Sequence, residues 1–327
     1  MQVMKIFLFR LVALIAVLML PVALLGQAES GSIVGTVKDA TGAVIAGATV
    51  TVRNVATGAQ RTAQSGGVGQ YNVGGLQVGT YEITVTSGNF APYKTNAEVT
   101  VGGTATVDAQ LATGRASTTV EVVAGAGGTE VNTQTQELSQ LVDTQQLAQL
   151  PSLTRNPYDF IQISGNVSGG DSTTPNAMGS QNLTGRGTGF SINGQRESGT
   201  EVLLDGAENI DLFNATVGQN VPVDSVQEYR VITNNFDTQY GRASGGIVNL
   251  TTKSGTNGFH GSVWEFNRLS AYTANTFGND AQNAIFKLNG GTGPLPAPKG
   301  SYTRNQFGFI VGGPVIKDKL FFSASTE

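Results

Sequence analysis

The sequence predicts a mainly β protein: a β-sandwich, then an α+β segment, then the first strands of a transmembrane β-barrel. Three observations support this. Of the 327 residues, 44 are glycine and only 13% are charged, which favours frequent turns over long charged helices. Short runs with alternating apolar and polar residues recur along most of the chain. Cysteine is absent, which excludes disulfide scaffolds and thiolate metal sites.

The first 28 residues predict an exported protein with a cleaved signal peptide. Lys5 and Arg10 give a positive start, residues 11–25 form an apolar run, and residues 26–28 supply a small-x-small cleavage site. The alternative is a membrane anchor. It is disfavoured because Pro21 interrupts the run and a spanning helix needs about 20 apolar residues.

Residues 29–113 predict the β-sandwich. Alternating runs such as SIVGTV, ATVTVRN and YEITVTS are separated by glycine-containing turns, which is the pattern of closely spaced strands in a sandwich. The apolar positions expected to face its core are Val50, Val52, Ile83, Val85, Val99 and Val101.

The stretch GTVKDATGAVIAGATVTVRNVATG, followed by GQYNVGGLQVGTYEITVTSGNF, resembles the carboxypeptidase regulatory-like domain. Gly35, Val37 and Asp39 match the start of the family pattern, and Asn89 in GNF departs from it because the family often runs Gly directly into Phe. The resemblance implies no peptidase activity. A zinc carboxypeptidase needs at least two histidine ligands, and His260 is the only histidine, so we expect no enzyme, no catalytic residue and no metal or other cofactor.

Residues 114–134 are rich in Gly, Thr and Gln and predict a linker. The linker contains the apolar, β-branched run TTVEVVA, which resembles the TonB box of TonB-dependent outer-membrane receptors. That resemblance implies a TonB-type periplasmic energy protein as partner, which would add the segment as a strand to its own sheet. The alternatives are an edge strand of the sandwich or plain linker. The candidate box consists of Thr118, Thr119, Val120, Glu121, Val122, Val123 and Ala124.

Residues 135–255 predict a mixture of short helices and strands. The apolar residues of LSQLVDTQQLAQLPSL have near-helical spacing, which predicts a helix ending at Pro151. GTGFSINGQR, EVLLDGAENI, QEYRVITNN and GGIVNLTTK then read as short strands and loops.

The same segment resembles the plug domain of TonB-dependent outer-membrane receptors, because several family motifs occur in order over more than a hundred residues. The first is QQLAQLPSLTRNPYDF, and the last is DSVQEYRVITNNFDTQYGRASGGIVNLTTKSG. The plug-motif residues are Arg186, Gly187, Asn193, Gly194, Arg196, Asp205, Gly206, Tyr240, Gly241, Gly245 and Gly246. The carboxylates of LLDGAENID could instead suggest a calcium or substrate site. The spacing is not that of an EF-hand, and Asp-Gly favours a turn.

Residues 256–327 predict the start of an outer-membrane β-barrel. GFHGSVWEFNR and RNQFGFIVGGPVIKDKLFFSAS alternate, with a short charged turn between the last two strands and a long polar loop before them. Trp264, Phe266, Phe307 and Phe309 could form an aromatic membrane girdle, or alternatively a sandwich core. Only about three membrane strands fit this length, whereas the receptors that the chain resembles have barrels of about 22 strands, so we expect an N-terminal fragment.

The resemblance implies TonB-dependent transport of a ligand across the bacterial outer membrane, with the plug gating a barrel pore. Expected partners are outer-membrane lipid and a small-molecule, oligosaccharide or peptide ligand. Nucleic acid is not expected, because the net charge is −4 and no basic cluster occurs. The alternative function is a secreted or surface-attached adhesion protein whose sandwich binds carbohydrate.

Overall fold

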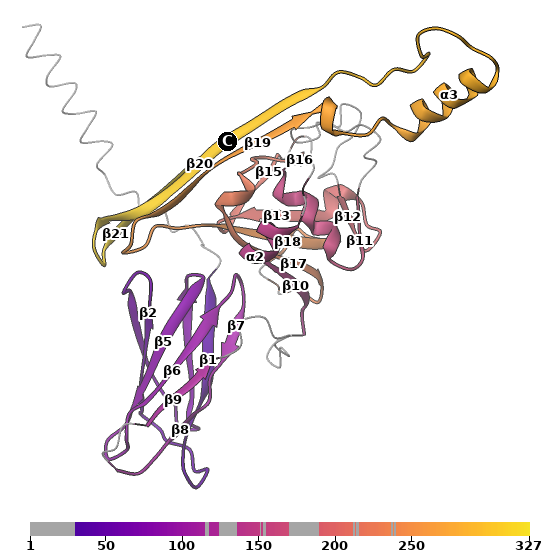
Figure 1. The fold of residues 1–327 in the computed structure, drawn as a ribbon. Coiled ribbons are helices and arrows are strands. Elements are labelled where there is room, and N and C mark those ends of the chain that lie inside the picture. Colours follow the sequence, from indigo (N-terminus) through magenta and orange to yellow (C-terminus); the bar gives the residue numbers. More distant parts are fainter. Residues whose placement is uncertain are drawn as a thin grey trace, which may run out of the picture.

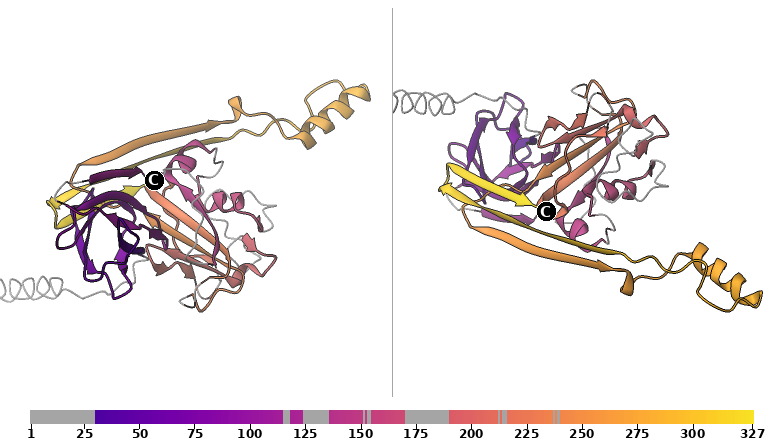
Figure 2. Two further views of the ribbon diagram at one scale, coloured as in Figure 1. Left: turned by 90° about the horizontal axis from the view of Figure 1, so that it is seen from below. Right: turned by 90° about the horizontal axis from the view of Figure 1, so that it is seen from above.

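The computed structural model describes residues 30–114, 118–123, 136–150, 152, 155–169, 190–211, 213, 216–236, 238 and 240–327. They form an N-terminal β-sandwich, an α+β unit and a long three-stranded sheet (Figure 1). The long sheet runs past both other units: the sandwich lies near one end and the α+β unit lies along its length (Figure 2). The predicted signal peptide lies outside the described residues.

The sandwich consists of two facing sheets. One sheet has the order β4 (Gln70–Leu76), β1 (Gly31–Asp39), β7 (Thr104–Thr106), and β8 (Ala109–Leu111) also pairs with β1. The other has the order β3 (Gln60–Gln64), β2 (Thr49–Asn54), β5 (Gly79–Thr86), β6 (Tyr93–Val99), β9 (Thr118–Val123). The sequence prediction of a sandwich is confirmed.

The core between these sheets confirms most of the predicted inward positions. Val50, Val52, Ile83, Val85 and Val99 all belong to one buried apolar cluster. The sixth predicted position, Val101, is fully buried but lies beyond the end of β6, where it contacts the α+β unit.

The α+β unit is built on a five-stranded sheet with one parallel pair, β13 with β18. Its strand order is β10 (Leu138–Asp143), β17 (Val226–Asn234), β18 (Gly246–Thr252), β13 (Thr200–Leu204), β14 (Ala207–Glu208). The remaining elements are α2 (Thr144–Gln149), the 3-10 helices η1 (Pro157–Ile163), η2 (Glu197–Gly199) and η3 (Val223–Ser225), and the hairpins β11 (Val167–Gly169) with β12 (Phe190–Ile192) and β15 (Ile210–Asp211) with β16 (Thr216–Val217).

The helix predicted from residue 138 to Pro151 was wrong in its first half. Residues 138–143 form strand β10, which pairs with β17 along its whole length, and the helix α2 has only six residues. A capping box sets the helix start: the Asp143 carboxylate accepts from the Gln146 N–H at 2.8 Å, and the Gln146 side chain accepts from the Asp143 N–H at 3.3 Å. Leu138 and Leu141 therefore belong to a strand.

The two faces of the five-stranded sheet differ in chemistry. Along β17, Tyr229 and Val231 point into the larger apolar cluster, which also contains Tyr158. The alternate residues Glu228 and Arg230 point to the opposite face and are buried there. One face of this sheet therefore forms the larger apolar core, and the other buries charged groups beside a smaller apolar cluster that contains Ile232.

The long sheet consists of β19 (His260–Leu269), β20 (Thr303–Ile316) and β21 (Leu320–Thr326), all antiparallel. The segment between β19 and β20 contains η4 (Ser270–Tyr272) and α3 (Phe277–Leu288) and extends beyond the end of the strands (Figure 1). No closed barrel forms among the described residues. None of the helices in the described ranges has the length and apolar character needed to cross a membrane.

The predicted alternation along β20 is confirmed, but the four aromatic residues of the predicted girdle do not share one face of the sheet. Phe307 and Phe309 are exposed on the face that points away from the α+β unit. Trp264 and Phe266 lie on the other face, where both rings pack near the Arg155 guanidinium. Residues directly opposite each other in an antiparallel pair share a face, and Trp264 is opposite Gly308. Trp264 and Phe266 therefore lie on one face, and Phe307 and Phe309 lie on the other.

Candidate functional site

The α+β unit contacts both neighbouring units through charged side chains, and these contacts form the candidate site. We call the contact with the long sheet the wall junction; it comprises Arg155, Asp224, Trp264, Phe266 and Glu327. We call the contact with the sandwich the sandwich junction; it comprises Val101, Glu137, Ser139, Glu228 and Arg230.

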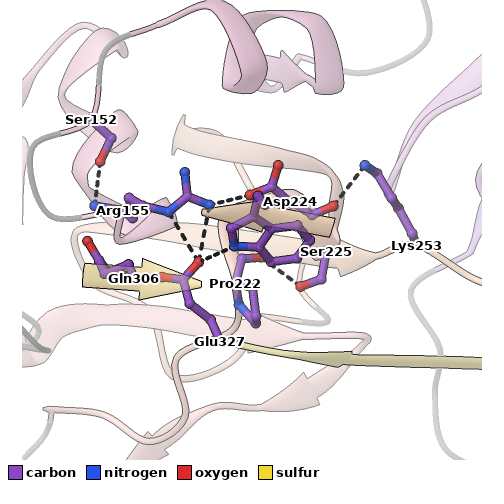
Figure 3. Close-up of polar contacts among 9 residues, drawn as sticks. Ser152, Arg155, Pro222, Asp224, Ser225, Lys253, Gln306 and Glu327 are labelled. Carbon is purple, nitrogen blue, oxygen red and sulfur yellow. Dashed lines mark hydrogen bonds and ion pairs between the residues drawn. The ribbon is translucent and has the colours of Figure 1, made fainter. Parts of the chain in front are cut away.

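Arg155 is the centre of the wall junction (Figure 3). Its backbone has a positive φ of 61°, and its N–H donates to Ser152 Oγ at 2.7 Å. Its guanidinium forms an ion pair with Asp224 of the α+β unit. It forms a second ion pair, at 3.1 Å, with Glu327, which directly follows β21 of the long sheet. One side chain thus joins two units.

The long sheet also contributes aromatic and polar contacts to the ion pair between Arg155 and Glu327. The Arg155 guanidinium carbon lies 3.9 Å from the Phe266 ring centroid, and the Trp264 Nε1–H donates to Glu327 Oε2 at 3.0 Å. Gln306 Nε2 donates to the other oxygen of Glu327 at 3.0 Å. The Arg155 side chain is only 12% exposed, so its charge is largely removed from water and its partners matter more than those of a surface pair.

The acidic partner within the α+β unit is also held in place. Asp224 lies in η3, its backbone carbonyl accepts from Lys253 Nζ at 2.8 Å, and the Lys253 N–H donates to the Ser225 carbonyl at 2.8 Å. Lys253 directly follows β18, so these two hydrogen bonds connect the end of a central strand to η3 at the wall junction (Figure 3).

The sandwich junction is built around the backbone of Val101. Its N–H donates to the Glu228 carboxylate, and its carbonyl accepts from Arg230 at 3.3 Å. Arg230 also forms an ion pair with Glu137 at 3.0 Å and donates to Ser139 Oγ at 3.0 Å. The Arg230 and Glu137 side chains are 9% and 10% exposed. Two buried charges of β17 therefore satisfy both backbone groups of one sandwich residue.

The charge state of Glu228 is sensitive to this environment. Burial raises the pKa of the Glu228 carboxyl to about 7, although the hydrogen bond from Val101 acts in the opposite direction. Among nearby charges, Glu98 and Asp143 raise this pKa further and Arg230 lowers it. The sandwich junction therefore contains a carboxyl group that titrates near neutral pH.

The predicted plug-motif residues form turns and close contacts within the α+β unit. Asn193 and Gly194 both have positive φ, and the Asn193 amide donates to the carbonyls of Thr233 and Gly245. A Cβ on Gly246 would lie 2.8 Å from the Ile232 carbonyl oxygen, so only glycine fits there. These residues therefore lie together where β12 ends and β18 begins.

The Asp-Gly pair has the turn geometry that the sequence predicted. Asp205 and Gly206 have φ of 51° and 79° between β13 and β14, which is the type I′ pattern of a tight hairpin. Asp205 also accepts from the Thr252 N–H at 2.7 Å, while Glu208 pairs with Arg242. These carboxylates have separate protein partners and do not converge.

The other motif residues are more dispersed. Tyr240 is buried in a small cluster with Leu203, Ile232 and Ile247, and Gly241 follows it on the surface. Arg196 precedes η2 and makes no cap hydrogen bond. Gly245 is buried beside Gln195. Arg186 and Gly187 lie outside the described residues.

The candidate TonB box lies at the edge of the sandwich. Its residues 118–123 form β9, which pairs in parallel with β6, and Ala124 lies outside the described residues. This is the edge-strand arrangement that the sequence left open as an alternative.

Comparisons with known proteins show what the chain is similar to. Residues 251–327 match the family described as an outer membrane beta barrel domain, and residues 32–112 match the carboxypeptidase regulatory-like domain. The TonB-dependent transporter Oar of Myxococcus xanthus is 25% identical over 305 residues, which cover 91% of this chain. The chain resembles a TonB-dependent outer-membrane transporter of the Oar type. It spans 26% of the length of that relative.

Solved structures are also similar to parts of this chain. The siderophore receptor PirA of Acinetobacter baumannii is 22% identical, with a TM-score of 0.38 over 57% of this chain and 23% of its own. A mutant of the ferric enterobactin receptor PfeA of Pseudomonas aeruginosa is 18% identical, with a TM-score of 0.35 over 55% of this chain and 22% of its own. The barrel-domain match and the Myxococcus relative, rather than these low scores, place the protein in the outer membrane.

Sequence reasoning did not assign the residues of the two junctions. Arg155 and Glu228 lie inside the motifs that carried the family resemblance, but the sequence gives no indication of what they contact. Their partners are remote: Glu327 is 172 positions from Arg155, and Val101 is 127 positions from Glu228. No local signal was available, because Arg155 and Glu228 both have polar immediate neighbours in the sequence, as surface residues commonly do.

Proposed function

We propose that this protein transports a ligand across the outer membrane in a TonB-dependent manner, with the α+β unit as the plug of a β-barrel pore. The observation that supports the proposal best is the wall junction. It links the α+β unit to the sheet whose sequence matches an outer membrane beta barrel domain, on the face opposite to exposed Phe307 and Phe309. The part of the exposed face formed by Val263, Phe307 and Phe309 suits lipid, and the other face contacts the α+β unit that we propose as the plug.

The wall junction is suited to a contact that must hold the plug and also release it. A guanidinium between two carboxylates and an aromatic ring gives a directional contact. The contact uses few side chains, so a pull on the chain can break it without unfolding the apolar core. The transported ligand belongs to one of the classes expected from the sequence: a small molecule, an oligosaccharide or a peptide.

Deleting residues 136–255 from the protein expressed in its bacterial host tests the plug assignment. Without a plug, the barrel should admit hydrophilic antibiotics that are normally excluded by size, so the cells should become more sensitive to them. Deleting residues 30–112, the matched regulatory-like domain, is the control and should leave the barrier closed. If cells with correctly inserted, plug-deleted protein keep their normal resistance, the plug assignment is wrong.

The partner is tested separately. A synthetic peptide of residues 118–124 should bind the host's TonB-type periplasmic protein, and its Val122→Pro version should bind at least about tenfold more weakly, because proline removes a backbone donor. Equal binding by both peptides would contradict recognition by strand addition.

A further inference from the structure

The segment that we propose as the TonB box is paired with the sandwich, and this pairing is an addition to the domain. The regulatory-like match ends at residue 112, whereas β9 begins at Thr118. The other strands of both sheets lie within the matched range or begin one residue before it. β9 therefore extends a sheet whose family pattern is already complete.

The pairing of β9 with β6 is irregular. Thr118 and Thr119 are opposite Tyr93 and Lys94, but the next pair is Val123 with Asn96, so β9 advances four residues while β6 advances two. The other edge of β6 pairs with β5 through seven consecutive residues. Parallel pairing is slightly less stable per residue, and an interrupted ladder loses hydrogen bonds. β9 is thus held more weakly than β5.

Strand β6 is equipped to become an edge when β9 leaves. Its buried residues alternate with exposed Lys94, Asn96 and Glu98, and Lys94 pairs with Glu82 of β5 at 3.7 Å. Charged side chains along an edge strand discourage pairing between molecules. The sandwich can therefore release β9 without exposing an apolar edge.

We propose that the β6 edge stores the segment 118–123, and that the TonB-type protein must withdraw this strand from the sandwich in order to bind it. This inference rests on the proposed function. The irregular ladder supplies the reason for competition: a partner sheet needs a straight strand, and β9 can become straight only by leaving β6. The segment can bind only while it is released from β6. The apparent affinity of the whole protein for the TonB-type protein is therefore reduced in proportion to the fraction of molecules in which the segment is released.

Residues 1–327 contain no cysteine, so an engineered pair would be the only thiols in this part of the protein, which allows a direct test. The double variant Lys94→Cys with Thr119→Cys places a pair across β6 and β9, at positions that are in register. The matched control, Thr84→Cys with Lys94→Cys, uses the same β6 position but joins β6 to β5. Both proteins are prepared as the full chain in isolated outer membranes, and binding of the purified periplasmic domain of the TonB-type protein is measured before and after oxidation.

Oxidation should weaken binding to the Lys94/Thr119 variant by about tenfold or more, and reduction should restore it. The Thr84/Lys94 control should bind equally in both states. Storage is wrong if the oxidised Lys94/Thr119 protein binds as well as the reduced one, or if this pair fails to crosslink where the control pair does.

The free peptide of residues 118–124 separates this inference from the proposed function. If the peptide binds and crosslinking changes nothing, storage fails while the proposed partner stands. If the peptide does not bind, the proposed partner fails, and storage of a TonB box fails with it.

Discussion

The two junctions of the α+β unit use the same chemistry in different surroundings. At the sandwich junction, the Arg230 and Glu137 side chains are about nine-tenths buried and pair with each other. Arg230 also donates to the Val101 carbonyl and to Ser139 on the neighbouring strand β10. At the wall junction, Arg155 is mostly buried, but its partner Asp224 is 36% exposed. The first junction has little access to water and the second has more.

This difference suggests a division of tasks. Charges buried without water are costly to separate, because each is then left unpaired in a low-dielectric environment. Charges with partial access to water can exchange a protein partner for water at a lower cost. We therefore expect the sandwich and the proposed plug to move together, and the wall junction to be the contact that opens.

The largest expected effect is that of Arg230→Met. It leaves Glu137 without its cation inside the sandwich junction, so the free energy of unfolding should fall by about 3–5 kcal/mol. Denaturant unfolding of the purified protein measures this change. The control is Arg242→Met, which breaks an ion pair whose side chains are both 42% exposed and should cost about 0–1 kcal/mol. Equal losses in both variants would remove the distinction between buried and exposed pairs.

A smaller effect is expected for Arg155→Lys at the wall junction. Lysine keeps the charge but loses the planar group that lies over Phe266 and reaches two carboxylates, so local opening should become easier by about 1–2 kcal/mol. Amide hydrogen exchange in residues 155–163 should accelerate while that of β17 stays unchanged. The control is Arg268→Lys, whose guanidinium lies over Tyr302 and not over a ring of this junction. Acceleration in both regions would show that the two junctions open as one.

A third comparison concerns pH at the sandwich junction. Because burial raises the pKa of Glu228 to about 7 in the folded protein, from an ordinary value near 4.5, the folded state binds the proton more tightly than the unfolded state. Its contribution to stability is fully present below about pH 4.5 and is lost as the pH rises through 7. Glu228→Gln keeps an oxygen that can accept from Val101 and cannot ionise. This variant should therefore flatten the decrease in melting temperature between pH 5 and pH 8, and a slope equal to that of the unchanged protein would contradict the assignment.

Much of the local structure could be predicted from the sequence. The sandwich core positions follow from a two-residue alternation, and Asp205-Gly206 forms a tight turn because both residues tolerate positive φ. The opposite faces of β20 follow from the same alternation. These features depend on neighbours within a few positions, which a single sequence displays.

Other features depend on contacts between distant residues, and only the tertiary structure decided them. Leu138 and Leu141 fit a helix by spacing, but pairing with β17 makes them a strand. The ring of Phe266 fits a lipid-facing girdle by type, yet it packs against Arg155. Residues 118–123 have the composition of a strand, but the sequence does not say that β6 is the strand with which they pair. Alternation tells which residues share a face, whereas the group on the other side of that face is determined by the packing of whole units.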